Sequence, residues 1–179
     1  MATPTTLPAT FVAGNVLTAA QMNDLRGAFR VLQVVSTAKT DTFSTTSTTF
    51  VDLTGLTVSI TPSSANSKVL IICNIGVTNT STASGMASKL VRGATDIGIG
   101  DAASSRTRAT KAGVGNAARN LDLSFTFLDS PATTSATTYK VQVMTGNGGT
   151  LIVNASGDDT NFAYHPRFIA TITAMEISA

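Results

Sequence analysis

Beyond residue 30, apolar residues alternate with polar ones along most of the chain, with the period of two that a half-buried β-strand requires. The alternation is clear at Leu56, Val58 and Ile60, and again along 121–127 and 139–143. Turn residues separate these runs roughly every 10–15 residues, a spacing typical of all-β folds. The pattern predicts an antiparallel jelly-roll sandwich over residues 31–179, built from about nine or ten short strands.

The strongest predicted strand, 68–77, is apolar on both faces. Cys73 lies on its consistently apolar face, whereas Leu70 and Ile72 lie on the other. A strand that is apolar on both faces is expected at the centre of a sheet. The last predicted strand, 168–177, is expected to have both faces covered. Cys73 is accordingly predicted to be a small buried hydrophobe and not a nucleophile.

Residues 15–30 have helical spacing instead. Thr18 fits the N-cap and Gln21 the third helical position, a pair that forms a capping box. The apolar residues then recur on one side of the predicted helix, at Met22, Leu25 and Phe29. Because a helix of about ten residues is marginal alone, this apolar side is expected to be buried against another surface.

An extended arm precedes the helix, since Pro4 and Pro8 disfavour helix at the residues before them. We therefore divide the chain into an arm and helix, 1–30, and a β domain, 31–179. The apolar residues of the first part are predicted to contact a neighbouring subunit or a larger assembly, with a tail packed on its own domain as the alternative. These residues are Leu7, Phe11, Val12, Leu17, Met22, Leu25 and Phe29.

Composition narrows the class of function. Charged residues make up 12% of the chain, about half the usual share of roughly 25%, while 31 Thr and 17 Ser supply polarity. A net charge of +2 indicates neither a nucleic-acid nor a membrane partner, and no apolar run approaches the roughly 20 residues that span a bilayer. The first residues lack a signal-peptide pattern, so synthesis in a cytoplasm is expected. This composition favours a shell or fibre protein over a metabolic enzyme.

Candidate chemistry is sparse, and no catalytic, cofactor or metal site is predicted. Residues 113–118 match a shortened dinucleotide fingerprint, but a polar loop precedes them and a strand follows, where the motif needs a strand and a helix. Asp158, Asp159 and His165 could supply metal ligands, yet the sequence offers no second histidine. A solvated loop is the favoured interpretation.

The longest predicted irregular segment, 104–119, is also the most basic. It carries Arg106, Arg108, Lys111 and Arg119. Two interpretations stay open: a solvated surface loop, or a contact with an acidic partner surface such as a capsid protein or neighbouring subunit. The same charge would suit anionic surface glycans.

The segment 11–25 resembles the N-terminal segment of many tailed-bacteriophage virion proteins, which carry Gly, then Leu-Thr-Ala-Ala, then Asn and Leu. The corresponding residues here are Gly14, then Leu17, Thr18, Ala19 and Ala20, then Asn23 and Leu25. The stretch 40–71 also resembles phage structural and fibre proteins. The strand pattern from there onward is similar to trimeric jelly-roll heads of the tumour-necrosis-factor and C1q type.

The resemblance implies a non-enzymatic virion protein that forms homotrimers. The leading hypothesis is a cement or decoration protein on the capsid surface, whose arm and helix bind the major capsid protein or another virion protein. The alternative is a receptor-binding head or tail fibre tip. In that case the loops at 79–86, 101–119 and 157–166 would recognise a host surface glycan or protein.

Overall fold

The computed structural model describes residues 14, 16, 18, 19, 22, 31–81, 84–115, 120–146, 148–157 and 159–178. Thirteen strands occupy these ranges. They are β1 (Val31–Lys39), β2 (Phe43–Thr45), β3 (Val51–Ile60), β4 (Lys68–Asn74), β5 (Gly76–Asn79), β6 (Ser84–Arg92), β7 (Thr95–Ile97), β8 (Lys111–Gly115), β9 (Leu121–Asp122), β10 (Phe125–Asp129), β11 (Thr137–Thr145), β12 (Leu151–Val153) and β13 (Ala170–Ile177).

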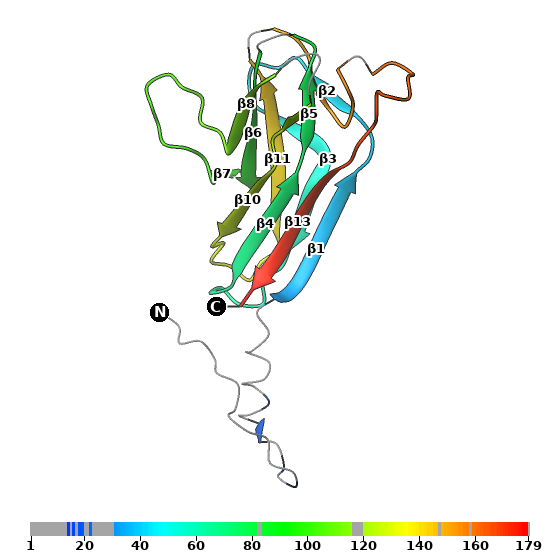
Figure 1. Ribbon diagram of the computed structural model, residues 1–179. Helices are drawn as coiled ribbons and strands as arrows, with labels where there is room; N and C mark the ends of the chain where they lie inside the picture. The colour runs from blue at the N-terminus through cyan, green and yellow to red at the C-terminus, as the bar shows by residue number, and fades with distance from the viewer. Residues whose placement is uncertain are drawn as a thin grey trace.

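The strands form a sandwich of two layers (Figure 1). The front layer in this view holds a sheet of order β1-β13-β4-β10, and a shorter sheet, β2-β12-β5-β9, continues it at the upper end. The rear layer has the order β3-β11-β6-β7, with β8 also paired to β6. Every strand pair is antiparallel.

The pairing of the main strands has the order of a jelly roll. The outermost strands in sequence, β1 and β13, pair with each other. Moving inward along the chain, β3 pairs with β11, β4 with β10 and β6 with β8. The chain thus forms a long antiparallel ribbon that folds over on itself, with β13 joining β4 and β11 joining β6. The predicted jelly-roll fold is confirmed.

Inward-facing residues of both layers make one core. The alternation that predicted the strands predicts these residues too, because β3, β4, β11 and β13 each bury every second side chain. A bulge in β3 changes the phase once: Leu53 and Leu56 are both fully buried, with Gly55 between them at φ +84°. The positive φ at Gly55 lets the strand turn both leucines inward.

Two predicted boundaries were wrong. The run 68–77 is divided between two strands, because the strand is interrupted at Ile75, whose backbone N–H donates to Ser124 Oγ at 2.9 Å. The segment 104–119 is not one irregular loop, since β8 lies inside it and pairs with β6. Ala112 and Gly113 carry no strand signal of their own, so their conformation follows from that pairing.

Little of the predicted arm and helix falls within the described residues. The backbone N–H of Met22 donates to the Thr18 carbonyl at 3.0 Å, a bond of helical spacing, and Met22 is exposed. The other predicted contact residues lie outside the described residues: Leu7, Phe11, Val12, Leu17, Leu25 and Phe29. The helix and the division at residue 30 therefore stay predictions. In the part of the chain described, no helix has the length and apolarity to cross a membrane.

Candidate functional site

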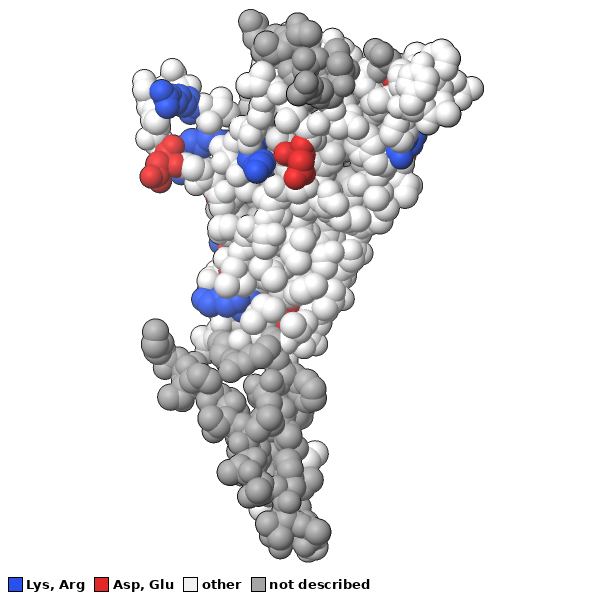
Figure 2. Space-filling view, viewed as in Figure 1, with Lys and Arg blue, Asp and Glu red and all other residues white. Residues whose placement is uncertain are grey.

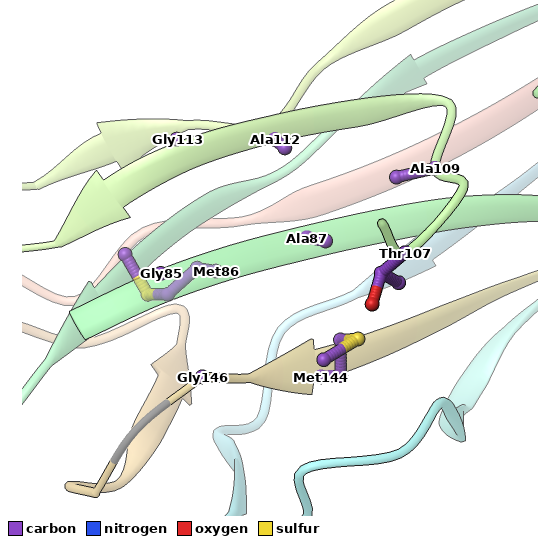
Figure 3. A pocket seen from close by; sticks show the side chains of 9 residues that line it. All are labelled: Gly85, Met86, Ala87, Thr107, Ala109, Ala112, Gly113, Met144 and Gly146. Carbon is purple, nitrogen blue, oxygen red and sulfur yellow. The ribbon is translucent and has the colours of Figure 1, made fainter. Parts of the chain in front are cut away.

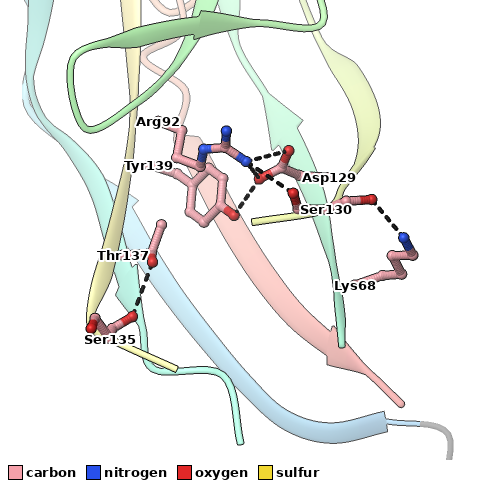
Figure 4. Close-up of polar contacts among 7 residues, drawn as sticks. All are labelled: Lys68, Arg92, Asp129, Ser130, Ser135, Thr137 and Tyr139. Carbon is pink, nitrogen blue, oxygen red and sulfur yellow. Dashed lines mark hydrogen bonds and ion pairs between the residues drawn. The ribbon is translucent and has the colours of Figure 1, made fainter. Parts of the chain in front are cut away.

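A charged network joins the two layers inside the lower half of the sandwich (Figure 4). Arg92 Nη1 on β6 lies 2.9 Å from both carboxylate oxygens of Asp129 on β10. The Tyr139 hydroxyl on β11 donates to Asp129 Oδ2 at 2.7 Å, and Tyr139 is fully buried. Burial, together with the bond to Asp129, raises the pKa of Tyr139. Because the carboxylate is already bound to both partners, the network is suited to holding the layers together and not to catalysis.

A second buried carboxylate, Glu176 on β13, stabilises the lower end of the sandwich. Its Oε1 accepts bonds from the backbone N–H and the hydroxyl of Ser63, both at 2.7 Å. Its Oε2 accepts a bond from Gln33 Nε2 at 2.6 Å. Burial alone would raise the pKa of Glu176, but the bonds from Ser63 and Gln33 outweigh it and lower the pKa to about 2. This site too is structural, because donors from β1 and the turn after β3 occupy both oxygens.

The residues considered for chemistry are not arranged for it. Cys73 is buried in the core, and burial raises the pKa of its thiol. Asp159 forms a two-bond ion pair with Arg167, at 2.6 and 2.7 Å. Among the described residues, no three His, Cys, Asp or Glu side chains are grouped to hold a metal ion. Of the shortened fingerprint at 113–118, Gly113 lies within β8.

The predicted basic contact loop is only partly a loop. Arg106 and Arg108 are exposed on the segment between β7 and β8, which projects at the upper left of Figure 1. Arg108 Nε donates to the Gly100 carbonyl at 2.6 Å, within the same segment. Lys111 instead begins β8, and Arg119 lies outside the described residues. The structure therefore brings two of the four predicted residues together on one projecting loop.

A small hollow opens beside β6, β8 and β11 in the rear layer (Figure 3). Its volume is about 190 Å³, below the range of roughly 300–1,000 Å³ typical of small-molecule sites. The lining consists of Gly85, Met86, Ala87, Thr107, Ala109, Ala112, Gly113, Met144 and Gly146. Thr107 supplies the one polar side chain in this lining, so the hollow lacks the converging polar groups of an active site.

The most distinctive surface is the outer side of the β1-β13-β4-β10 sheet, which we call the front face. Strand register places four apolar residues side by side across all four strands: Val34, Met175, Leu70 and Leu128. We call these four residues the apolar row. Val34 and Leu128, at its two ends, are each 54% exposed, and Ile72 next to the row is 39% exposed. Neighbouring strands lie about 4.8 Å apart, so the row is a continuous apolar band about 14 Å wide.

The front face also carries little charge. Lys68, at the lower end of β4, is the charged residue among the outward-facing described residues of these four strands. The other charged residues of the four strands, Lys39, Asp129 and Glu176, are buried. Figure 2 shows the result: charged side chains lie near the two ends of this face and its middle has none.

The front face corrects one expectation from the sequence. Strand 68–77 was predicted to be a central strand, and β4 does lie between β13 and β10. Strand 168–177 was predicted to be covered on both faces, because it is apolar on both sides. The sandwich has two layers, so one side of each strand faces the core and the other faces outward. Apolar residues such as Val34 and Ile72 are left exposed in the single chain. Leu70 and Met175, between the two ends of the row, are half-buried. Because exposed apolar residues gathered on one face are a feature of interaction surfaces, we take the front face as the candidate functional site.

Comparisons with known proteins give a likeness of fold only. No protein-family model matches the sequence, and neither does a curated protein. A structure of infectious bursal disease virus, Gt strain, is similar over 82% of this chain and 38% of that chain, with 16% identity and a TM-score of 0.45. The structure of T=1 particles derived from that virus is similar over 82% of this chain and 36% of that chain, with 10% identity and a TM-score of 0.42. The chain thus spans less than two fifths of those virus-particle proteins.

Proposed function

We propose that this chain is a non-enzymatic structural protein of a bacteriophage virion that assembles into homotrimers through the front face. Residues 1–30 would then attach the trimer to the capsid, where it acts as a cement or decoration protein. The observation that carries the proposal is the uncharged apolar row on an otherwise complete sandwich. The virion assignment rests on the resemblance of segments 11–25 and 40–71 to phage virion proteins.

The absence of charged residues from the middle of the front face, among the described residues, favours other copies of the same chain as its partner. In a symmetric assembly, residues near the axis meet their own counterparts, so a charge there would meet a like charge. An apolar and hydroxyl-bearing face avoids that repulsion. The apolar row would supply the buried centre of the contact, and Ser36, Thr173 and Thr126 beside it would supply its polar margin.

The position of Val31 in the sandwich supports a separate role for residues 1–30. Val31, where β1 begins, pairs with Ile177 at the end of β13, at the lower end of the sandwich (Figure 1). The loops between β7 and β8 and between β12 and β13 lie at the upper end. An anchor joined at Val31 would leave those loops pointing away from the capsid. Cementing requires no chemistry, because a bound trimer stabilises the shell by mass action.

Replacing Leu70 by lysine (Leu70→Lys) should convert the trimer to monomers. Leu70 lies inside the row, opposite Met175 of β13 on one side and Leu128 of β10 on the other, so three copies would bring three positive charges into one apolar contact. Light scattering coupled to size-exclusion chromatography measures the mass directly, and circular dichroism checks the fold. The matched control is Val114→Lys on β8 in the rear layer, where Val114 is 66% exposed; it should remain trimeric. A monomeric wild type, or a trimeric Leu70→Lys variant, contradicts the proposal.

Deleting residues 1–29 should leave a folded trimer that no longer binds virus particles. The deletion ends before β1 and removes none of the described strands. Binding to purified heads can be followed by co-sedimentation and by electron microscopy, with the full-length chain as the control. If the shortened chain still decorates heads, the assigned role of the arm is wrong. A few copies at the tail instead of regular copies over the head would favour the fibre-tip alternative.

A further inference from the structure

The segment between β12 and β13 carries a cluster of aromatic rings. Phe162 and Tyr164 are stacked, with ring centroids 5.4 Å apart and an interplanar angle of 8°. The His165 ring stands edge-on to both, with centroids 4.8 Å from Tyr164 and 5.8 Å from Phe162. The segment projects from the upper right of the sandwich (Figure 1).

The two stacked rings face solvent instead of the core. Tyr164 is 74% exposed and Phe162 is 57% exposed, and every other aromatic residue that the structure describes is buried or half-buried. Burying a side chain of this size contributes roughly 1.5–3 kcal/mol, which the single chain does not gain at these positions. The chain has ten Phe and Tyr in 179 residues, so exposing two of them side by side indicates a binding surface.

Polar contacts within the segment hold the rings in place. Arg167 and Asp159 form their two-bond ion pair across the base of the segment. Thr160 Oγ1 lies 2.6 Å from the ring nitrogen Nδ1 of His165. The backbone N–H of His165 donates to the Phe162 carbonyl at 2.9 Å. The aromatic surface is therefore formed before a ligand arrives, which lowers the entropy cost of binding.

We propose that Phe162 and Tyr164 form a platform for a pyranose ring of an uncharged glycan. The face of an aromatic ring carries the negative part of its quadrupole, and it attracts the slightly positive C–H groups on the apolar face of a sugar. Asn161, exposed between Thr160 and Phe162 in the chain, can bond the sugar hydroxyl groups. Arg167 is paired with Asp159, and the neighbouring Asp158 adds a second acidic residue to the segment, so the segment has no unpaired arginine with which to select an acidic sugar.

The platform does not depend on trimer formation or on the capsid. It lies at the end of the sandwich opposite Val31, on the same end as the loop of Arg106 and Arg108. A trimer would present three copies and raise the avidity for a polyvalent glycan surface. Binding by one platform can be measured on the isolated protein, in the monomeric Leu70→Lys variant if necessary.

The test is a titration with the methyl glycosides of glucose, galactose, mannose and N-acetylglucosamine and their short oligosaccharides. The chain has no Trp and two Tyr, of which Tyr139 is buried, so a change in tyrosine emission on adding sugar reports on Tyr164 in the wild type and in Val114→Ala. Saturation-transfer NMR, which detects the sugar C–H groups, measures binding to the variants that lack this tyrosine. We expect Tyr164→Ala to weaken binding at least about tenfold, and Tyr164→Phe, which keeps the ring, to bind as the wild type does.

Val114→Ala is the matched control, because it truncates an equally exposed apolar residue in the rear layer. It should leave binding unchanged. Failure of the wild type to bind any member of the panel at millimolar concentration overturns the proposal. So does a Tyr164→Ala variant that folds, by circular dichroism, and binds as tightly as the wild type.

Discussion

The variant Asp129→Ala is expected to lower the free energy of unfolding by about 3 kcal/mol, the lower end of the cost of removing one partner from a buried ion pair, because Asp129 is buried and Arg92 is partly exposed. The substitution leaves the Tyr139 hydroxyl, fully buried, without its acceptor. It also leaves the Arg92 guanidinium without a counter-ion. Arg92 and Tyr139 belong to the rear layer and Asp129 to the front layer, so the loss falls on the contact between the layers.

Urea denaturation followed by circular dichroism measures this loss. Asp52→Ala is the control, because Asp52 also pairs with a strand cation, Lys140, at 2.8 Å but is 48% exposed. An exposed pair contributes about 0–1 kcal/mol. The loss of stability for Tyr139→Phe should lie between the losses for Asp52→Ala and Asp129→Ala, at about 2 kcal/mol, since this variant removes one hydrogen bond to a charged group. Equal losses for Asp129→Ala and Asp52→Ala would contradict the assigned role of the network.

Acid is expected to destabilise the protein by about 3 kcal/mol as pH falls from about 4.5 to about 2. The pKa of Glu176 is about 2 in the folded chain, against 4.5 for an ordinary glutamate. Between these values the unfolded chain binds a proton that the folded chain does not. The stabilisation from Glu176 is therefore complete above about pH 5 and is lost progressively as pH falls through that window.

Denaturation midpoints measured between pH 2 and pH 7 give the curve, and Glu176→Gln isolates the contribution of this residue. The variant should be less stable than the wild type at pH 7, and the difference should shrink towards pH 2. Asp52 and Asp122 also have lowered pKa values, from side-chain bonds with Lys140 and Ser124, respectively. Both are exposed, so their contribution to the pH dependence of stability in the Glu176→Gln variant should be small. If the wild type and Glu176→Gln lose stability in parallel between pH 7 and pH 2, the hydrogen bonding described for Glu176 is contradicted.

Period-two alternation was enough to predict the fold class and most of the core. It identified the inward faces of 51–60 and 139–143 and the burial of Cys73. It did not find β8, because Ala112 and Gly113 take their conformation from pairing with β6 and have no large apolar residues to alternate. It also did not find the break at Ile75, where the strand changes partners from β10 to β9.

The front face had a signal in the sequence that was interpreted differently. Leu70 and Ile72 were recognised as a second apolar face and were interpreted as the mark of a central strand, which β4 is. In a two-layer sandwich one face of a central strand still points outward, and that exposed face is the one for which we propose a partner. The alignment of Val34 with Leu128 depends on register across four strands, which a single sequence does not specify.

The sequence alone could not distinguish Phe162 and Tyr164, the residues of the aromatic platform, from ordinary loop residues. Phe162 and Tyr164 stand two apart, which in a strand would place them on one face and suggest burial. What leaves them exposed is a loop conformation held by the Arg167–Asp159 pair and the contact of His165 with Thr160. Neither interaction has a sequence pattern.

The central position of β13 has a consequence for synthesis on the ribosome. This strand is hydrogen-bonded on one side to β1 and on the other to β4, yet it is the last of the described strands to be translated. In a nascent chain that stops before residue 170, β1 and β4 lack the strand that pairs with both of them. Such a chain also lacks Met175 from the apolar row. If the proposed trimer forms through the front face, only chains translated through β13 would display the complete contact surface, and truncated products would stay out of the assembly.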